Sequence, residues 1–269
     1  MEQIFLLTDL SDDAFHAARY AIQLRGTDGP RYTVVHAHSA AYTGDPMMPT
    51  SSMAPELLRI SEEGLREWSA RLRKATGVHA LEEHFGIGGV VAVLNELVHD
   101  QQLDLVVVGR SGKGGSAFFG STAVDVMKRS RMPVLVVPAG TPIVDPTSIL
   151  LADDHDDVGV RDLAMLRTIA ARAGANVIVA HAEMGVPEGS PHWSHGLYEI
   201  GLKGIQYKFM SAYGEDVVDG LLRLARKEHV QMVAILHRHL DLVTRLFHPS
   251  IAKDLVLQGD RPVLVLEQS

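Results

Sequence analysis

Three segments of the first half of the chain recur in the same order in its second half. The segment IFLLTDLSDD recurs as ILLADDHDD, and YTVVHAHSA recurs as NVIVAHAEM. Both pairs have an offset of 145 positions, which aligns Asp9 with Asp154 and His36 with His181. A third segment, STAVDVMKRSRMPVLVV, recurs as SIAKDLVLQGDRPVLVL with an offset of 129. This repeat predicts two similar units of ordinary domain size. Because the third segment has the smaller offset, the second unit should be shorter in its middle.

We therefore expect two domains, residues 1–140 and residues 147–269. The stretch around their boundary, PAGTPIVDPTS, is rich in proline and polar residues, as linkers tend to be. Hydrophobic residues make up 46% of the 269 residues, so each unit has enough apolar side chains for a packed core. The chain has no cysteine, which excludes disulfides and thiolate metal sites.

Charge and hydropathy narrow the classes of function. The net charge is −8 and no basic stripe offsets it, which argues against nucleic-acid binding. No apolar run approaches the roughly 20 residues that cross a bilayer, so we expect no membrane partner. An acid at position 2 and a short apolar run predict no signal peptide, and we expect a cytoplasmic protein.

Short apolar runs alternate with helical patterns along the first unit. Residues 4–7 and 103–108 are typical of buried strands, and Pro55–Thr76 has the spacing of a long amphipathic helix. The alternation predicts two tandem Rossmann-like, doubly wound α/β domains. Each should have a five-stranded, mainly parallel sheet of order 3-2-1-4-5 flanked by helices. Ligands of such sheets bind where the strand order reverses, so Asp9 and Gly109 should face one crevice.

The stretch GRSGKGGSAFFGST, from Gly109 to Thr122, carries five glycines. Glycine lets a backbone approach a ligand closely, and a loop of this kind points N–H groups at anions. A helix beginning at Ser121 would add its positive dipole end, and Lys113 would add a charge. The alternative is a surface loop whose glycines merely permit a turn.

Together these motifs resemble the universal stress protein family. The resemblance rests on Gly109-x2-Gly112, on Gly120-Ser121, on the run PVLVV, on LLTDLSDDAFHAARYAI, and on His36 at the end of strand 2. The resemblance extends over nearly the whole chain, because it occurs once in each half. The chain is therefore similar to a tandem universal stress protein. The resemblance implies a role in survival under starvation, oxidants or growth arrest.

The ATP-binding branch of that family holds phosphates and ribose with the glycines, and adenosine with the strand-1 acid and the backbone after strand 2. The resemblance thus implies ATP or another adenine nucleotide, with Mg²⁺ as a companion, in the first unit. The expected site residues are Thr8, Asp9, Ala37 (backbone), Val108, Gly109, Gly112, Lys113, Gly120, Ser121 and Thr122. Seven residues separate Gly112 from Gly120, where the family pattern has nine. This departure leaves AMP or ADP, weak ATP binding, and a scaffold without nucleotide as open alternatives.

The second unit lacks these features. Leu236 stands at the position of Gly109, His239 at that of Gly112, and Pro249 replaces Gly120. Side chains then fill the space of the phosphates, and proline removes a backbone donor. We expect a degenerate, structural unit that completes a pseudo-dimer, since the family usually dimerises through its last strand. Association of tandem chains into a homodimer and the identity of protein partners stay open.

Two further hypotheses concern chemistry. In the second unit Asp154, His155, His237 and His239 follow strands 1 and 4, and imidazole with carboxylate suits a Zn²⁺ ion. The competing interpretation, a solvated polar crevice without an ion, is favoured because the ligand spacing is not diagnostic. The glycines and Lys113 do not have P-loop spacing, and no nucleophile elbow or triad signature is present. We expect a binding protein with, at most, slow ATP hydrolysis.

Overall fold

The structure is a computed structural model that describes residues 2–38, 50–97, 105–110, 121–130, 132–153, 159–184, 195–237 and 249–267. The first half contains strands β1 (Gln3–Leu7), β2 (Arg31–His38), β3 (Leu81–Ile87), β4 (Leu105–Arg110) and β5 (Val134–Pro138). Its helices are α1 (Asp12–Arg25), α2 (Thr50–Thr76), α3 (Val90–Leu97) and α4 (Ser121–Arg129). The second half contains strands β6 (Ser148–Asp153), β7 (Asn176–Met184), β8 (Tyr207–Gly214), β9 (Met232–His237) and β10 (Val263–Glu267). Its helices are α5 (Ala164–Ala173), α6 (His195–Gly201), α7 (Val217–Lys227) and α8 (Pro249–Gln258).

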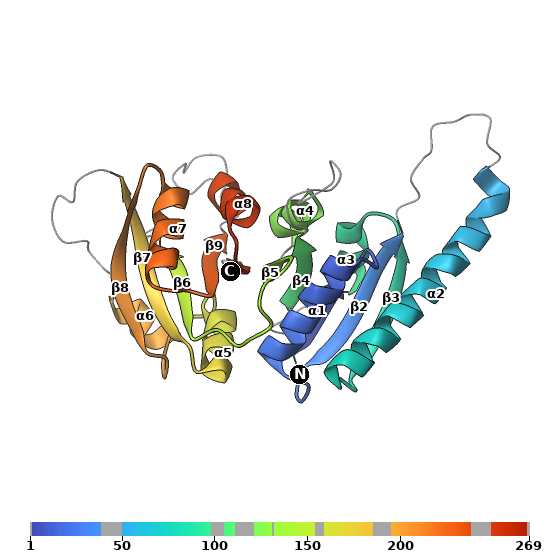
Figure 1. The fold of residues 1–269 in the computed structure, drawn as a ribbon, viewed down its shortest axis with the longest axis horizontal. Coiled ribbons are helices and arrows are strands. Elements are labelled where there is room, and N and C mark those ends of the chain that lie inside the picture. Colours follow the sequence, from blue (N-terminus) through green and yellow to red (C-terminus); the bar gives the residue numbers. More distant parts are fainter. Residues whose placement is uncertain are drawn as a thin grey trace.

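All of these strands belong to one ten-stranded sheet of order β3-β2-β1-β4-β5-β10-β9-β6-β7-β8 (Figure 1). Within each half every ladder is parallel and the order is 3-2-1-4-5, counted along that half. The predicted fold class is confirmed. The last strands of the halves, β5 and β10, pair antiparallel at the centre of the sheet, with Leu135 opposite Leu264.

The strand registers carry the same offsets as the sequence repeat. Leu6 pairs with Val34 between β1 and β2, and Leu151 pairs with Val179 between β6 and β7, each 145 positions on. Two halves with matching registers have matching patterns of buried residues, because each strand alternates its side chains between the two faces of the sheet. The repeat in the sequence is therefore a repeat of the sheet itself.

Two hydrophobic cores cover the two faces of the sheet. One packs against α1, α2, α5 and α6, and the other packs against α3, α4, α7 and α8. Each core contains residues from both halves, so it continues across the joint between β5 and β10. Strands covered on both faces explain the unbroken apolar runs of β4, β5, β9 and β10.

Helix α2 begins earlier than the sequence predicts. The spacing of apolar residues predicts a helix over Pro55–Thr76, whereas the helix in the structure starts at Thr50. Pro55 therefore lies inside the helix, where its missing N–H removes one backbone hydrogen bond. The C-terminal part of α2 buries Trp68 against the sheet. Its N-terminal part extends beyond the sheet and exposes Leu57 and Ile60 (Figure 1).

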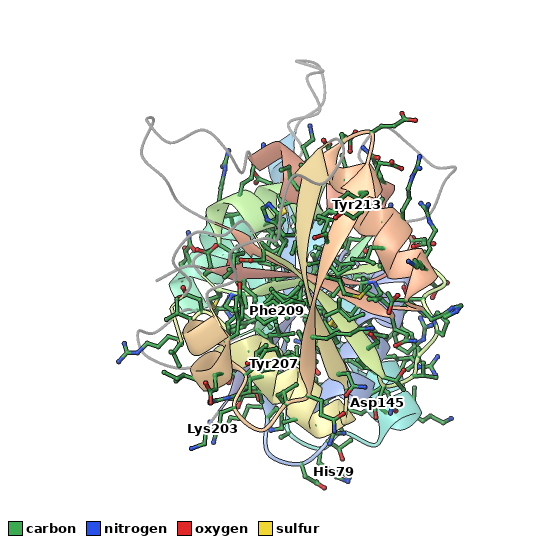
Figure 2. All side chains as sticks on the ribbon, turned by 90° about the vertical axis from the view of Figure 1, so that its left-hand side faces the viewer. His79, Asp145, Lys203, Tyr207, Phe209 and Tyr213 are labelled. Carbon is green, nitrogen blue, oxygen red and sulfur yellow. The ribbon has the colours of Figure 1, made fainter. Side chains whose placement is uncertain are left out.

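Strand β8 forms one outer edge of the sheet, and Figure 2 looks onto it. The ring of Phe209 makes edge-to-face contacts with Tyr207 on the same strand and with Tyr198 on α6, at centroid distances of 5.7 and 5.6 Å. This geometry aligns ring edges with ring faces and is the preferred one for aromatic pairs. The three rings therefore close the core at this edge. None of the described helices is long and apolar enough to cross a membrane.

Glu267, the last residue of β10, should make the stability of the folded protein depend on pH. Burial raises the pKa of its carboxyl group from 4.5 to about 8, so the folded chain holds this proton more tightly than the unfolded chain does. The free energy of unfolding should fall as the pH rises between these two values, because ionisation in the folded state must occur in a buried place. The Glu267→Gln variant, which cannot ionise, should lose this part of the pH dependence.

Urea denaturation of the wild type and of Glu267→Gln, at about pH 5 and about pH 8.5, measures the effect. The variant should gain stability relative to the wild type at the higher pH. Identical changes of unfolding free energy in the two proteins would contradict the assignment.

Candidate functional site

The carboxyl ends of β1, β2 and β4 lie together along one side of the sheet, because these strands run parallel. This side is called the carboxyl edge. Leu6 pairs with Val107, and continuing this register by two residues brings Thr8 beside Gly109. The backbone N–H of Thr8 donates to Val35 O at 2.9 Å, which ties the end of β1 to β2. The structure thus brings the ends of strands 1, 2 and 4 together, as predicted.

The turn from β1 into α1 is held by its own side chains. The hydroxyl of Thr8 accepts the N–H of Leu10 at 2.8 Å, and Asp9 Oδ1 accepts the N–H of Ser11 at 3.0 Å. Ser11 in turn caps α1, because its hydroxyl accepts the N–H of Ala14 at 3.2 Å. Leu10 has a φ of 69°, a left-handed conformation that a branched residue adopts only when its surroundings impose it.

This turn presents a carboxylate at the strand end. Asp9 is exposed, and its bond to Ser11 fixes the orientation of the side chain. A carboxylate has several lone-pair sites and only accepts hydrogen bonds, so the remaining sites suit hydroxyl or amino groups. Sugar hydroxyls and the exocyclic amine of adenine are groups of this type.

A histidine near the end of β2, and one near the end of β7 in the second half, each bond to the neighbouring strand. Nδ1 of His36 lies 2.9 Å from Thr8 O, and Nδ1 of His181 lies 3.0 Å from Asp153 O. Because a carbonyl only accepts, Nδ1 carries the proton in each case. The interpretation of His36 as a strand-end side chain is confirmed, and it holds for its repeat partner as well.

Gly109 lies against the first turn of α1. A Cβ at this position would be 2.9 Å from Asp13 O, closer than such atoms approach. Leu236 occupies the equivalent position of β9 and is buried. In that half the corresponding helix begins only at Ala164, seven residues later than the offset from Asp12 predicts. The absence of a side chain at Gly109 therefore has a packing reason of its own.

Of the other expected site residues, some belong to the described part of the chain and some do not. Val108 is 5% exposed and belongs to the core under α3 and α4, so its side chain is part of the packing. Ala37 pairs with Gly86 in the β2–β3 ladder, Ser121 begins α4, and Thr122 is exposed in its first turn. Three expected phosphate-binding residues lie outside the described residues: Gly112, Lys113 and Gly120.

At the carboxyl edge of the second half, the strand equivalent to β1 ends in a buried acid. Asp153 takes the place of Thr8 and is 2% exposed. The hydroxyl of Tyr198, on α6, donates to Asp153 Oδ1 at 2.6 Å. A buried carboxylate needs such donors, so this contact is part of how the second half packs. Sequence reasoning missed it, because the two residues are 45 positions apart and belong to different elements.

The metal hypothesis is not tested by the structure. Asp154, His155 and His239 lie outside the described residues, and so does the side chain of His237. Among the described residues, no group of three His, Cys, Asp or Glu side chains is placed to hold a metal ion.

Arg110, the residue after Gly109, has a role that the sequence did not indicate. Its Nη1 donates to Leu257 O at 3.1 Å, and its Nη2 donates to Gly259 O. These carbonyls are at the C-terminal end of α8, in the other half of the chain. Burial lowers the pKa of Arg110, and the charge of Asp260 opposes that shift. A partner 147 residues away leaves no local pattern in the sequence.

Comparisons with known proteins agree with this architecture. The profile of the universal stress protein family matches residues 1–138, and the chain belongs to this family. A Thermus aquaticus relative, described as "Universal stress protein in QAH/OAS sulfhydrylase 3'region", is 30% identical over 138 residues. That alignment covers 50% of this chain and 96% of the relative.

Two solved structures are similar to this chain to different extents. A universal stress protein from Archaeoglobus fulgidus DSM 4304 covers 99% of this chain and 98% of its own, with 19% identity and a TM-score of 0.76. At that identity the likeness establishes the fold, with both halves in place. A universal stress protein solved in complex with cAMP covers 51% of this chain and 96% of its own, with 23% identity and a TM-score of 0.37.

The packing role of Gly109 predicts a loss of stability on substitution. Gly109→Ala places a methyl group against the backbone of α1 and should lower the free energy of unfolding by about 1–3 kcal/mol. The matched control is Gly196→Ala, since an added Cβ at this exposed glycine in α6 meets no atom within 4 Å. The control should lose no stability, because alanine favours a helix over glycine. Urea denaturation compares the two, and a Gly109→Ala variant as stable as the wild type would refute the packing role.

Proposed function

We propose that the first half of this universal stress protein binds an adenine nucleotide and that the protein acts as a nucleotide-responsive regulator in the stress response. The observation that carries the proposal is the exposed carboxylate of Asp9, oriented by the N–H of Ser11. It lies at the end of β1, beside β4, where the strand order of the half reverses. Ligands of doubly wound sheets bind at this point.

The groups at this edge match the parts of a nucleotide. Asp9 would accept hydrogen bonds from ribose hydroxyls or from the adenine amine, while phosphates would lie away from its negative charge. The first turn of α4 contains no acidic residue, so the positive end of its dipole is not neutralised locally. Gly112, Lys113, Gly120 and Ser121 would then hold the phosphates. With ATP or ADP, the phosphate oxygens would also supply ligands for Mg²⁺.

The second half has a structural role in this proposal. Leu236 is buried where the first half has Gly109, and Asp153 with Tyr198 fills the position of Thr8. A negative charge at Asp153 disfavours a phosphate nearby. We therefore assign one nucleotide to each chain.

A scaffold that binds no nucleotide is the second candidate. The observation that favours it is the loop between Gly112 and Gly120, which is two residues shorter than the family pattern. The two candidates differ in a single measurable property, the binding of a nucleotide by the purified chain.

Isothermal titration of the chain with ATP, ADP and AMP in the presence of Mg²⁺ tests the proposal. Wild-type protein should bind one nucleotide per chain. Asp9→Asn should weaken binding by about tenfold, since the variant loses charge-assisted hydrogen bonds, and Gly112→Val should abolish it. Asp154→Asn changes the aligned acid of the second half and is the matched control, so its affinity should equal that of the wild type. No binding of any nucleotide by wild-type protein would favour the scaffold.

A further inference from the structure

Helix α2 packs against the turn between β1 and α1. Helices α1 and α2 lie side by side over the same face of the sheet (Figure 1). Nε1 of Trp68, on α2, donates to Ser11 O at 3.4 Å, and the Trp68 ring meets the ring of Phe15 edge-to-face at a centroid distance of 5.4 Å. Trp68 is buried. The turn that carries Asp9 therefore rests on a firmly packed part of α2.

Leu10 is the strained residue of that turn. Its φ of 69° brings its Cβ close to the following carbonyl oxygen, a conformation that glycine adopts freely and leucine adopts at a cost. Its side chain is partly buried and packs against the core that α1 and α2 share. Such a conformation persists only where the surroundings impose it, so the packing of the Leu10 side chain decides the shape of the turn.

Gly64 lies opposite the Leu10 side chain, in the interior of α2. Glycine destabilises a helix interior relative to alanine, and Gly64 is not in the left-handed region that would require glycine. A Cβ added to it would lie 3.0 Å from Leu10 Cδ1, tighter than nine in ten contacts of this kind. The missing side chain at Gly64 is therefore explained by the space that Leu10 occupies and not by the helix itself.

The conformation of Leu10 controls the carboxylate of Asp9. Leu10 lies between Asp9 and Ser11, and Asp9 Oδ1 accepts the N–H of Ser11 at 3.0 Å. A rotation about φ of Leu10 moves that N–H relative to the carboxylate, so it changes the direction in which the carboxylate is held. A displacement of the Leu10 side chain at Gly64 is thus passed on to Asp9 through a single residue of backbone.

We infer that Gly64 is a positioning residue of the nucleotide site, because its missing side chain lets Leu10 hold the turn that aims the carboxylate of Asp9. The inference rests on the proposed function. It concerns the hydrogen bonds that Asp9 would accept from the ligand. A group that is held in its binding geometry before the ligand arrives loses less freedom on binding, so disturbing the turn weakens affinity without removing any ligand contact.

The first test is Gly64→Ala. Nucleotide affinity, measured by titration with ATP, should fall by about fivefold, which is less than the loss expected for Asp9→Asn because the carboxylate is misaligned and not removed. The midpoint of urea denaturation should not fall, because alanine favours a helix and the added methyl meets only the end of a flexible side chain. Gly196→Ala, a helical glycine of the second half with open surroundings, is the matched control and should leave the affinity unchanged.

A double-mutant cycle shows whether the effect passes through Leu10. Leu10→Gly removes the side chain that the new methyl would meet and still allows a positive φ, so this variant should retain binding. In its background, Gly64→Ala should change the affinity by less than about twofold. A general disturbance of α2 would instead give the same loss in both backgrounds.

The amide resonance of Ser11 gives a readout that does not need a nucleotide. It should move in Gly64→Ala, because the N–H of Ser11 changes its bond to Asp9, and it should not move in Gly196→Ala. Adding Gly64→Ala to Leu10→Gly should leave it where Leu10→Gly alone places it.

Wild-type affinity in Gly64→Ala would overturn the inference and leave the proposed function standing. An equal loss in the Leu10→Gly background, or an unmoved Ser11 resonance in Gly64→Ala, would overturn it too. No binding by wild-type protein would overturn the proposed function, and the inference with it.

Discussion

The antiparallel pairing of β5 with β10 is the contact on which the rest of the structure depends. Without it, each half would end in an apolar strand with unpaired backbone groups, an arrangement that promotes aggregation. With it, the two five-stranded halves become one sheet and the two cores run across the joint. The pairing also places α4 beside α8 and α1 beside α5. Arg110 can therefore donate to Leu257 O, and Arg172 to Leu24 O, each across the joint between the halves.

The two halves are alike in their strand registers and differ at the carboxyl ends of their strands. The registers of the two halves match, so the apolar strand positions have kept the same packing in both. At the carboxyl ends of the strands the halves differ, because Thr8 and Gly109 of the first half correspond to a buried Asp153 and a buried Leu236 in the second. The second half contributes five strands and α8 to the shared sheet and its cores. Under the proposed function, the first half binds the nucleotide and the second half supports it.

Features encoded by local patterns were predictable from the sequence, and features that depend on the meeting of distant elements were not. Strand order and repeat offsets follow from apolar runs and from the repeat, and the equivalence of Gly109 and Leu236 is confirmed by the ladders. The pairing of the last strands was expected from the family resemblance. The predicted start of α2 was wrong, because the apolar spacing that predicted the helix begins only at Leu57, whereas the helix starts at Thr50. The partners of Arg110 and of Tyr198 depend on how helices from separate segments pack. The glycine loop itself lies outside the described residues, so its phosphate-binding role stays a prediction.

The proposed function makes the two halves unequal, with one nucleotide in the first half and none in the second. Photolabelling with azido-ATP, followed by peptide mapping of the labelled chain, tests it most directly. Label should appear only on peptides from residues 1–138. It should disappear when unlabelled ATP competes for the site. Competed label on peptides from the second half would contradict the account, because it would show a nucleotide where Leu236 and Asp153 are buried.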